Sequence, residues 1–206
     1  MKVSLTDAGK RFNRDWIFRH LTYTFEEGNS YAIVGPNGSG KSTLLQVLSG
    51  AMQASEGTCE WSIRNRQLPN DEVYNHVSIC APYLEVVEEM TIKEFLGFHH
   101  HFKPFLASLS IDCIIASVGL SEAVRKQIRY YSSGMKQRVK LAQAFFSDTP
   151  ILLLDEPCTN LDVTGIELYH KLIEDYCVNR LVIVSSNDEI EYKFCRKRIN
   201  VVDYKK

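Results

Sequence analysis

The sequence lacks any long apolar run. Its apolar stretches, such as ILLL at residues 151–154 and LVIV at residues 181–184, are far shorter than the roughly 20 residues that a membrane-spanning helix needs. The first residues, MKVSLTDAGKRF, also lack the apolar segment of a signal peptide. We therefore expect a cytoplasmic protein that acts on a membrane only through a partner.

An excess of charge of one sign is missing too. The formal net charge is −1, so no global basic field points to nucleic acid as a partner. The six cysteines include no CxxC pair, which favours free thiols over disulfides or a zinc site. The run His99–His101 does not suggest a metal site either, because consecutive helical residues point about 100° apart and cannot converge on one ion.

The 206 residues, 45% of them hydrophobic, are enough for one large domain with a sizeable core. No repeat or linker divides the chain. Aromatic and β-branched residues near the N-terminus predict short strands, with turn signals at Gly9, Asn13 and Gly28–Asn29. The segment KSTLLQVLSG predicts a helix that Gly50 closes at the C′ position.

The middle of the chain has helical patterns. Thr91 and Glu94 form a capping-box pattern that opens a helix ending before Pro104. Further helices are expected over Ile111–Val118, Gly134–Phe146 and around Gly165–Cys177, the last between the strands ILLL and LVIV. The predicted fold class is α/β, with N-terminal strands, a mostly parallel core and a helical stretch, at about residues 88–140, inserted in that core.

A glycine-rich stretch carries the clearest chemical signal. Residues 35–42, GPNGSGKS, match the phosphate-loop pattern directly after the strand YAIV and before a helix. The glycines let several backbone N–H groups point at one anion, and the helix adds the positive end of its dipole. The lysine can reach β- and γ-phosphates, and the serine hydroxyl can bind Mg²⁺. The sequence therefore predicts a nucleoside triphosphate site made by Gly35, Pro36, Asn37, Gly38, Ser39, Gly40, Lys41, Ser42 and Thr43.

Two acids follow the strand ILLL. Ligands of parallel sheets bind beyond the carboxyl ends of the strands, where the glycine-rich loop also lies. We expect Asp155 to hold Mg²⁺, directly or through water, and Glu156 to orient or deprotonate the attacking water. Pro157 ends the strand because it offers no N–H donor.

At this point the chain resembles the ATP-binding domain of ABC (ATP-binding cassette) proteins over essentially its whole length. YSSGMKQRVKLAQAF stands where that family has its signature motif, and Ser132 and Gly134 agree with the pattern. Tyr131, Ser133 and Met135 depart from it. The resemblance implies a P-loop NTPase core with an N-terminal antiparallel β subdomain and an inserted helical subdomain.

The resemblance also assigns roles. Ser132 and Gly134 would bind the γ-phosphate held by an opposing cassette, and Asp162 would contact that opposing site. Phe12 matches the aromatic position that stacks on adenine, with Trp16 a weaker candidate; the alternative is that Phe12 is a core aromatic.

Two catalytic positions depart from the family. Tyr83 stands where a glutamine usually contacts Mg²⁺ and the attacking water. Asn187, after the strand LVIV, stands where a histidine usually binds the γ-phosphate; its amide can donate to the same oxygens but cannot relay a proton. The alternative is that Asn187 only caps the next helix, a task that Ser186 could share.

The resemblance implies a function. The chain is expected to be an ATP- and Mg²⁺-dependent ATPase that powers an ABC transporter by closing and opening a dimer of cassettes, homodimeric or heterodimeric. A membrane-spanning permease would hold it at the inner face of the cell membrane, and no nucleic-acid partner is expected. The alternatives are a soluble ABC ATPase and a regulatory subunit that hydrolyses little ATP.

Overall fold

The computed structural model describes residues 1–205, which form two compact units. The first unit contains Met1–Ile79, Thr149–Glu156 and the stretch from Asn179 onwards. The second contains Cys80–Asp148 and Pro157–Val178.

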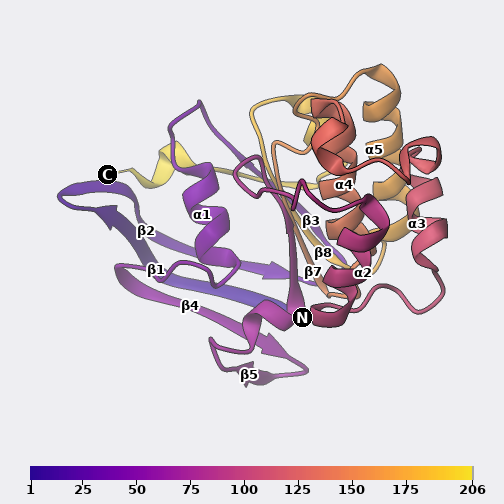
Figure 1. Ribbon diagram of the computed structural model, residues 1–206. Coiled ribbons are helices and arrows are strands. Elements are labelled where there is room, and N and C mark those ends of the chain that lie inside the picture. The colour runs from indigo at the N-terminus through magenta and orange to yellow at the C-terminus, as the bar shows by residue number, and fades with distance from the viewer. Residues whose placement is uncertain (206) are drawn as a thin grey trace. The chain divides into compact units, whose positions relative to one another are not determined.

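An antiparallel sheet forms one layer of the first unit. Its strands, in the order β2-β1-β4-β5, are β1 (Lys2–Phe12), β2 (Asp15–Glu26), β4 (Glu56–Ile63) and β5 (Arg66–Leu68) (Figure 1). The turn predicted at Asn13 is confirmed, with φ of 55°. The prediction of short strands with a turn at Gly9 is wrong. Gly9 lies inside β1, next to shifts in the pairing register with both neighbouring strands, so it belongs to a β-bulge and not to a turn.

A second sheet of five strands carries the chemistry. Its order is β6-β7-β8-β3-β9, with β3 (Ser30–Val34), β6 (Val77–Cys80), β7 (Ile151–Asp155), β8 (Leu181–Ser185) and β9 (Lys197–Asn200). The pairs β7–β8, β8–β3 and β3–β9 are parallel, which confirms the predicted mostly parallel core. Every residue of β7 and β8 is buried, and this explains why their apolar runs do not alternate with polar residues.

Helix α1 (Lys41–Leu48) joins the two sheets of this unit, since it contacts β1 on one side and β7 and β8 on the other. Its apolar residues, among them Leu44, Leu45 and Leu48, are fully buried. Gly50 has φ of 76° just beyond the helix, as predicted. The unit also contains α6 (Glu189–Tyr192) and the 3₁₀ turns Val73–His76 and Val201–Tyr204.

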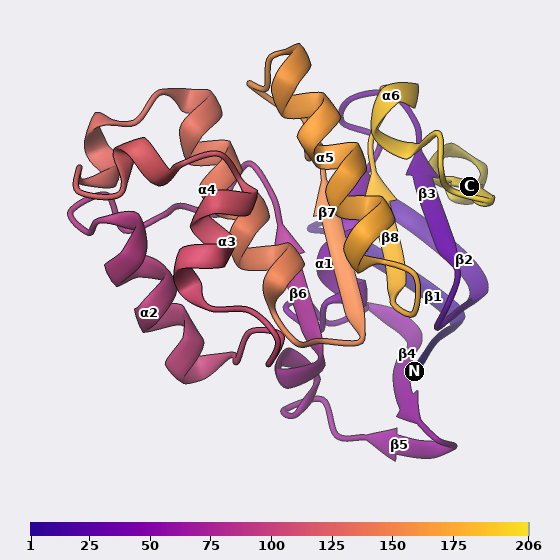
Figure 2. The same cartoon turned by 90° about the vertical axis from the view of Figure 1, so that its right-hand side faces the viewer.

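The second unit is helical. It consists of α2 (Ile92–Phe102), α3 (Ile111–Ser117), α4 (Ser133–Phe146) and α5 (Val163–Tyr176), with 3₁₀ turns at Ser121–Ala123 and Ile128–Tyr130. Helices α2 and α3 both contact α4, which also contacts α5 (Figure 2). The predicted capping box is confirmed, because Thr91 Oγ1 accepts from Glu94 N–H and Glu94 Oε2 accepts from Thr91 N–H at 2.8 Å. Within residues 1–205, no helix combines the length and apolar character that crossing a membrane requires.

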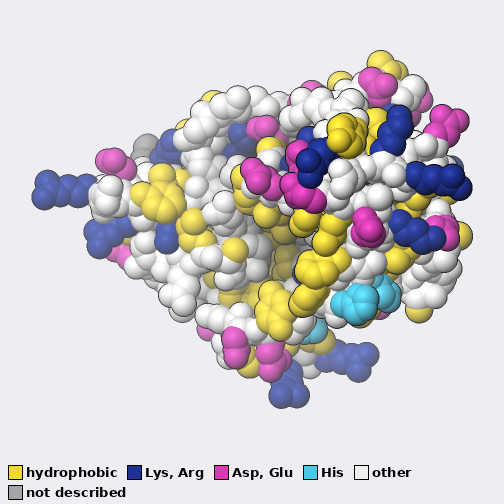
Figure 3. All heavy atoms as spheres, in the orientation of Figure 1, with side chains coloured by type: hydrophobic (Ala, Val, Ile, Leu, Met, Phe, Trp, Pro, Cys, Tyr) yellow, Lys and Arg dark blue, Asp and Glu magenta, His cyan; other side chains and the backbone are white. Residues whose placement is uncertain are grey.

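Histidine side chains gather over α2 (Figure 3). His99 Nε2 lies 2.9 Å from Ser147 Oγ, His100 Nδ1 accepts from Phe105 N–H, and His101 Nδ1 lies 2.7 Å from Gly97 O. These polar contacts go to three different groups, and the rings of His99 and His100 both pack against Phe105.

Candidate functional site

The glycine-rich loop follows β3 and leads into α1. Gly35, Gly38 and Gly40 have φ of 148°, 74° and 106°, conformations that side chains rarely adopt. A Cβ added at Gly40 would lie 2.2 Å from Ile17 Cγ2 on β2. Glycine at this position is therefore required twice, by its backbone angle and by the packing of β2 against the loop.

The loop leaves the start of α1 open to an anion. Gly40 supplies no side-chain cap, and the first turn contains no acidic residue. The unsatisfied N–H groups and the positive end of the helix dipole therefore face the loop. The hydroxyl of Ser39 is buried without a hydrogen-bond partner in the described chain, as expected for a polar group that a ligand satisfies.

Lys41 is folded over the loop. Its Nζ donates to Gly35 O at 2.9 Å and to Pro36 O at 3.3 Å, and the residue is only 5% exposed. A buried ammonium held only by carbonyl oxygens interacts favourably with a phosphate brought beside it.

The two acids lie at the end of β7, held by the neighbouring strand β8. Asp155 pairs with Ser185 in register, and Ser185 Oγ donates to Asp155 Oδ1 at 2.6 Å. Glu156 N–H donates to Ser185 O at 2.9 Å. Glu156 also has φ of 44°, a strained conformation for a residue with a side chain, and such strain is typical of functional positions.

Asn187 follows β8 and is exposed. The alternative that it caps the next helix is wrong. Asp188 is the N-cap of α6 and accepts from Ile190 N–H, while Ser186 Oγ accepts from Asp188 N–H at 2.9 Å. Two other side chains thus perform the local capping, and the Asn187 amide takes no part in it.

Three adjacent parallel strands bring these groups to one edge of the sheet. In the order β7-β8-β3, β7 ends in Asp155 and Glu156, β8 leads to Asn187, and β3 leads into the glycine-rich loop. Because carboxyl ends of parallel strands share an edge, a phosphate loop, two acids and an amide are brought together there. Carboxylate, hydroxyl and phosphate oxygens are the ligands that Mg²⁺ prefers, and Asp155 with Ser42 fits that donor set.

Phe12 ends β1 and is 46% exposed, so the alternative that it is a core aromatic is wrong. Lys10 Nζ lies 5.4 Å from its ring centroid. Its strand partner is Asp15, two residues before Ile17, which packs against Gly40. The hairpin that carries Phe12 is thus packed against the loop.

The second unit holds the remaining predicted residues. Ser132 is the N-cap of α4, where its Oγ accepts from Met135 N–H at 3.2 Å. A Cβ added at Gly134 would lie 2.9 Å from Asn160 O, so glycine lets the loop before α5 approach the start of α4. A cavity of about 840 Å³ opens there, lined by Ser132, Gly134, Asn160, Asp162 and neighbouring residues.

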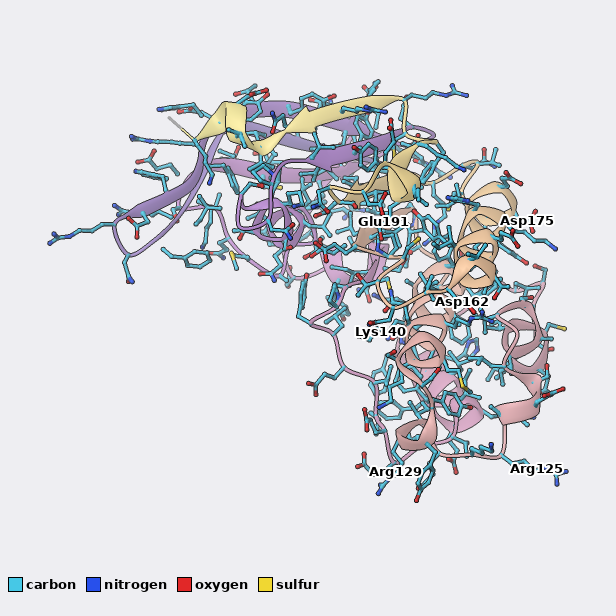
Figure 4. All side chains as sticks on the ribbon, turned by 90° about the horizontal axis from the view of Figure 1, so that it is seen from above. Arg125, Arg129, Lys140, Asp162, Asp175 and Glu191 are labelled. Carbon is cyan, nitrogen blue, oxygen red and sulfur yellow. The ribbon has the colours of Figure 1, made fainter. Side chains whose placement is uncertain are left out.

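Asp162 is the N-cap of α5, and Figure 4 shows it at the start of that helix. Its Oδ1 accepts from Gly165 N–H at 2.8 Å, Thr164 Oγ1 at 2.9 Å and Arg138 at 3.4 Å. These groups, the Gly165 N–H first, lower the pKa of the carboxyl below its ordinary value. A structural role for Asp162 thus accompanies the binding role that the sequence suggested.

Tyr83 lies in a turn of the second unit and is 45% exposed. Lys140 Nζ, from α4, donates to Pro82 O at 3.1 Å beside it. A phenol at this position can donate and accept hydrogen bonds, and its assignment as a catalytic residue stays a prediction.

The structure identifies residues that sequence reasoning missed. Ser185 contacts both acids, and Gln137, buried on α4, donates from Nε2 to Pro157 O at 2.7 Å. No local pattern distinguishes either residue. The strand register places Ser185 beside the acids, and the packing of α4 places Gln137 against Pro157.

A phosphate loop, strand-end acids and a mostly parallel sheet define a P-loop nucleotide-binding protein. The family model described as ABC transporter matches residues 18–159. The chain belongs to this family, whose ATP-binding domains hydrolyse ATP to drive transport.

Known proteins agree with this membership. The chain is 30% identical to the uncharacterized ABC transporter ATP-binding protein YybJ of Bacillus subtilis over 172 residues, 83% of this chain and 78% of that protein. It is 28% identical to the cytochrome c biogenesis ATP-binding export protein CcmA of Rhizobium etli, over 92% of this chain and 89% of that protein. The solved structure of the ATP binding subunit of an ABC transporter has the same fold, with a TM-score of 0.83 and 20% identity. The match covers 98% of this chain and 86% of that one.

Proposed function

We propose that this chain is the nucleotide-binding subunit of an ABC transporter and that its ATP cycle drives a separate membrane-spanning permease. The observation that carries the proposal is the shared edge of β7, β8 and β3, which brings the phosphate loop together with Asp155, Glu156 and Asn187. The alternatives, a soluble ABC ATPase or a weakly hydrolysing regulatory subunit, are less favoured because the relatives include an export protein.

ATP binding is assigned to the first unit. Lys41 would exchange its carbonyl partners for β- and γ-phosphate oxygens, and the N–H groups from Gly38 to Lys41 would surround the β-phosphate. The exposed ring of Phe12 would stack on the adenine, since stacking needs only a π-face.

Hydrolysis is assigned to the strand ends. Asp155 and Ser42 would hold Mg²⁺, which when bound with ATP neutralises charge on the phosphates. Glu156 would orient the attacking water and accept its proton. Asn187 would donate its amide hydrogens to the γ-phosphate, and Tyr83 would take the hydrogen-bonding part of the usual glutamine.

The second unit supplies the partner contacts. Ser132 and Gly134 at the start of α4, with Asp162, would face the nucleotide of an opposing cassette, which is a second copy of this chain or a related one. The permease would hold the pair at the inner face of the cell membrane; the relative named as an ATP-binding export protein supports a role in transport.

The proposal is tested with purified protein. Phosphate release should depend on both ATP and Mg²⁺, and Glu156→Gln should reduce it by at least a hundredfold while ATP still binds, because general-base catalysis contributes roughly 10²–10⁴-fold. Glu72→Gln, a change at an exposed position of the same unit, is the control and should keep the wild-type rate. A Glu156→Gln enzyme as fast as the wild type would contradict the assigned chemistry.

A further inference from the structure

Ser185 is the last residue of β8, between the strand of the acids and the strand of the phosphate loop. It is fully buried, it pairs with Asp155 of β7 on one side and with Ile33 of β3 on the other, and the next residue donates its N–H to Ile33 O. Ser185 is the first polar residue after the apolar run LVIV. A change from apolar to hydroxyl at a fully buried strand position requires a partner for that hydroxyl.

The side chain contacts the predicted metal ligand. Asp155 is 2% exposed, and a buried carboxylate needs hydrogen-bond donors or cations to replace the water it has lost. Ser185 Oγ lies 2.6 Å from Asp155 Oδ1, the short distance typical of a hydroxyl that donates to a carboxylate. A serine hydroxyl has a single proton. Donating it to Oδ1 restrains that oxygen and leaves Oδ2 able to bind another ligand.

The backbone of the same residue contacts the predicted base. Ser185 O accepts the N–H of Glu156 at 2.9 Å, at the residue whose φ of 44° turns the chain out of β7. A left-handed conformation in a glutamate persists only when its surroundings hold it. One residue thus contacts both acids, Asp155 through its hydroxyl and Glu156 through its carbonyl oxygen.

We propose that Ser185 is a positioning residue for ATP hydrolysis, whose hydroxyl orients the Asp155 carboxylate toward Mg²⁺ while its backbone fixes the turn that presents Glu156. The inference rests on the proposed function of this edge, which it extends to the residue behind the metal ligand. Groups that orient a metal ligand set its affinity, and their removal typically lowers metal affinity or activity about 10- to 100-fold.

The test compares Ser185→Ala with Ser185→Thr. We expect the free Mg²⁺ concentration for half-maximal ATP hydrolysis to rise about tenfold or more in Ser185→Ala, and to stay within about twofold of the wild type in Ser185→Thr, which keeps the hydroxyl. A second readout is independent of turnover: the Mg²⁺ concentration at which the fluorescence of a bound mant-ATP probe changes should shift in the same way. Affinity for the probe in EDTA should be unchanged, since the hydroxyl does not contact the nucleotide.

Ser78→Ala is the matched control. Ser78 is also a buried serine of this sheet, and its hydroxyl donates to Ile151 O at the opposite end of β7. The Ser78→Ala variant should unfold at a lower temperature than the wild type, but its Mg²⁺ concentration for half-maximal ATP hydrolysis should be unchanged. Should Ser185→Ala fail to fold, Ser185→Cys, of similar size but a weaker donor, replaces it with the same expected shift.

The outcomes separate this inference from the proposed function. The proposed function stands if the wild type hydrolyses ATP and Glu156→Gln does not. If, in that case, Ser185→Ala and Ser78→Ala need the same Mg²⁺ concentration for half-maximal hydrolysis, Ser185 is only a structural residue. If the wild type does not hydrolyse ATP at any Mg²⁺ concentration, the proposed function fails, and the midpoint of mant-ATP fluorescence then decides the role of Ser185 by itself.

Discussion

Lys41 is a buried cation whose partners are backbone carbonyls. Carbonyl oxygens compensate only part of the cost of burying an ammonium, whereas a phosphate supplies a full opposite charge in the same low-dielectric surroundings. The residue is therefore poised to move from Gly35 O and Pro36 O to an incoming anion.

Lys41→Ala should weaken ATP binding by roughly 10- to 150-fold, because a hydrogen bond to a charged group contributes about 1.5–3 kcal/mol. Equilibrium titration with a fluorescent ATP analogue measures the change. Lys2→Ala, an exposed position on β1, should bind as the wild type does. Unchanged affinity in Lys41→Ala would argue against the phosphate-loop assignment.

Asn187 is an exposed amide whose neighbours Ser186 and Asp188 already satisfy the local backbone. Asn187→Ala should therefore leave stability within about 0.5 kcal/mol and lower turnover about tenfold or more, since a donor to the transferred phosphoryl group is lost. Asn187→His should retain activity. Steady-state kinetics with a parallel thermal melt separate the two effects, and a full-rate Asn187→Ala enzyme would remove this residue from the catalytic set.

At the scale of elements, packing between helices holds a neutral histidine. His99 of α2 is half-buried, and burial, followed by the charges of Lys103 and His100, lowers its pKa from 6.5 to about 4. Gln143 Nε2 of α4 lies 3.0 Å from His99 Nδ1, and Ser147 Oγ lies 2.9 Å from Nε2. Since an amide NH₂ can only donate, Nδ1 must be an unprotonated acceptor, which assigns the proton to Nε2.

This contact makes stability depend on pH in a defined direction. The unfolded chain binds a proton at His99 below a pKa of about 6.5, but the folded chain does so only near 4. Stability from this group is therefore present above pH 6.5 and is lost as the pH falls from about 6.5 to 4. Urea denaturation at pH 7.5 and at pH 5 measures the free energy of unfolding. Acidification should lower this free energy less in His99→Gln than in the wild type. His101→Gln, at the exposed side of α2, is the control and should lose as much unfolding free energy on acidification as the wild type does. Equal decreases in all three proteins would contradict the assignment of this pH dependence to His99.

At the scale of the whole molecule, the groups for nucleotide chemistry are divided between two compact units. The phosphate loop and acids belong to the first unit, and Ser132, Gly134 and Asp162 belong to the second. Under the proposed function, the second set acts on a nucleotide held by an opposing cassette, so catalysis requires two chains.

Ser132→Arg should block that association, because a long cation would fill the cavity at the start of α4. The Glu156→Gln variant with ATP should form a dimer in size-exclusion chromatography, and adding Ser132→Arg should return it to a monomer that still binds ATP. Lys171→Ala, an exposed change on α5, serves as the control and should leave the dimer intact. A stable dimer in the Ser132→Arg double variant would refute the paired arrangement.

Local signals in the sequence predicted most of the helices and strands and the position of the glycine-rich loop between a strand and a helix. Three signals involve only residues close together in the sequence: the capping box of Thr91 and Glu94, the C′ glycine Gly50 and the spacing of the phosphate loop. Each can therefore be predicted without knowledge of the tertiary structure. The same holds for the apolar runs that became β7 and β8. Gly9 was misread because glycine serves turns and bulges equally, and only the pairing partner distinguishes the two.

Only the tertiary structure determined which residues that are distant in sequence contact one another. The pairing of Asp155 with Ser185, the packing of Ile17 on Gly40 and the approach of Asn160 to Gly134 join residues far apart in sequence. No local propensity determines a strand register, because register follows from the packing of whole faces. The sequence by itself thus determined that this chain has a phosphate loop and two strand-end acids, whereas only the folded sheet determined that Ser185 holds those acids and that Asn187 is left free of the helix cap.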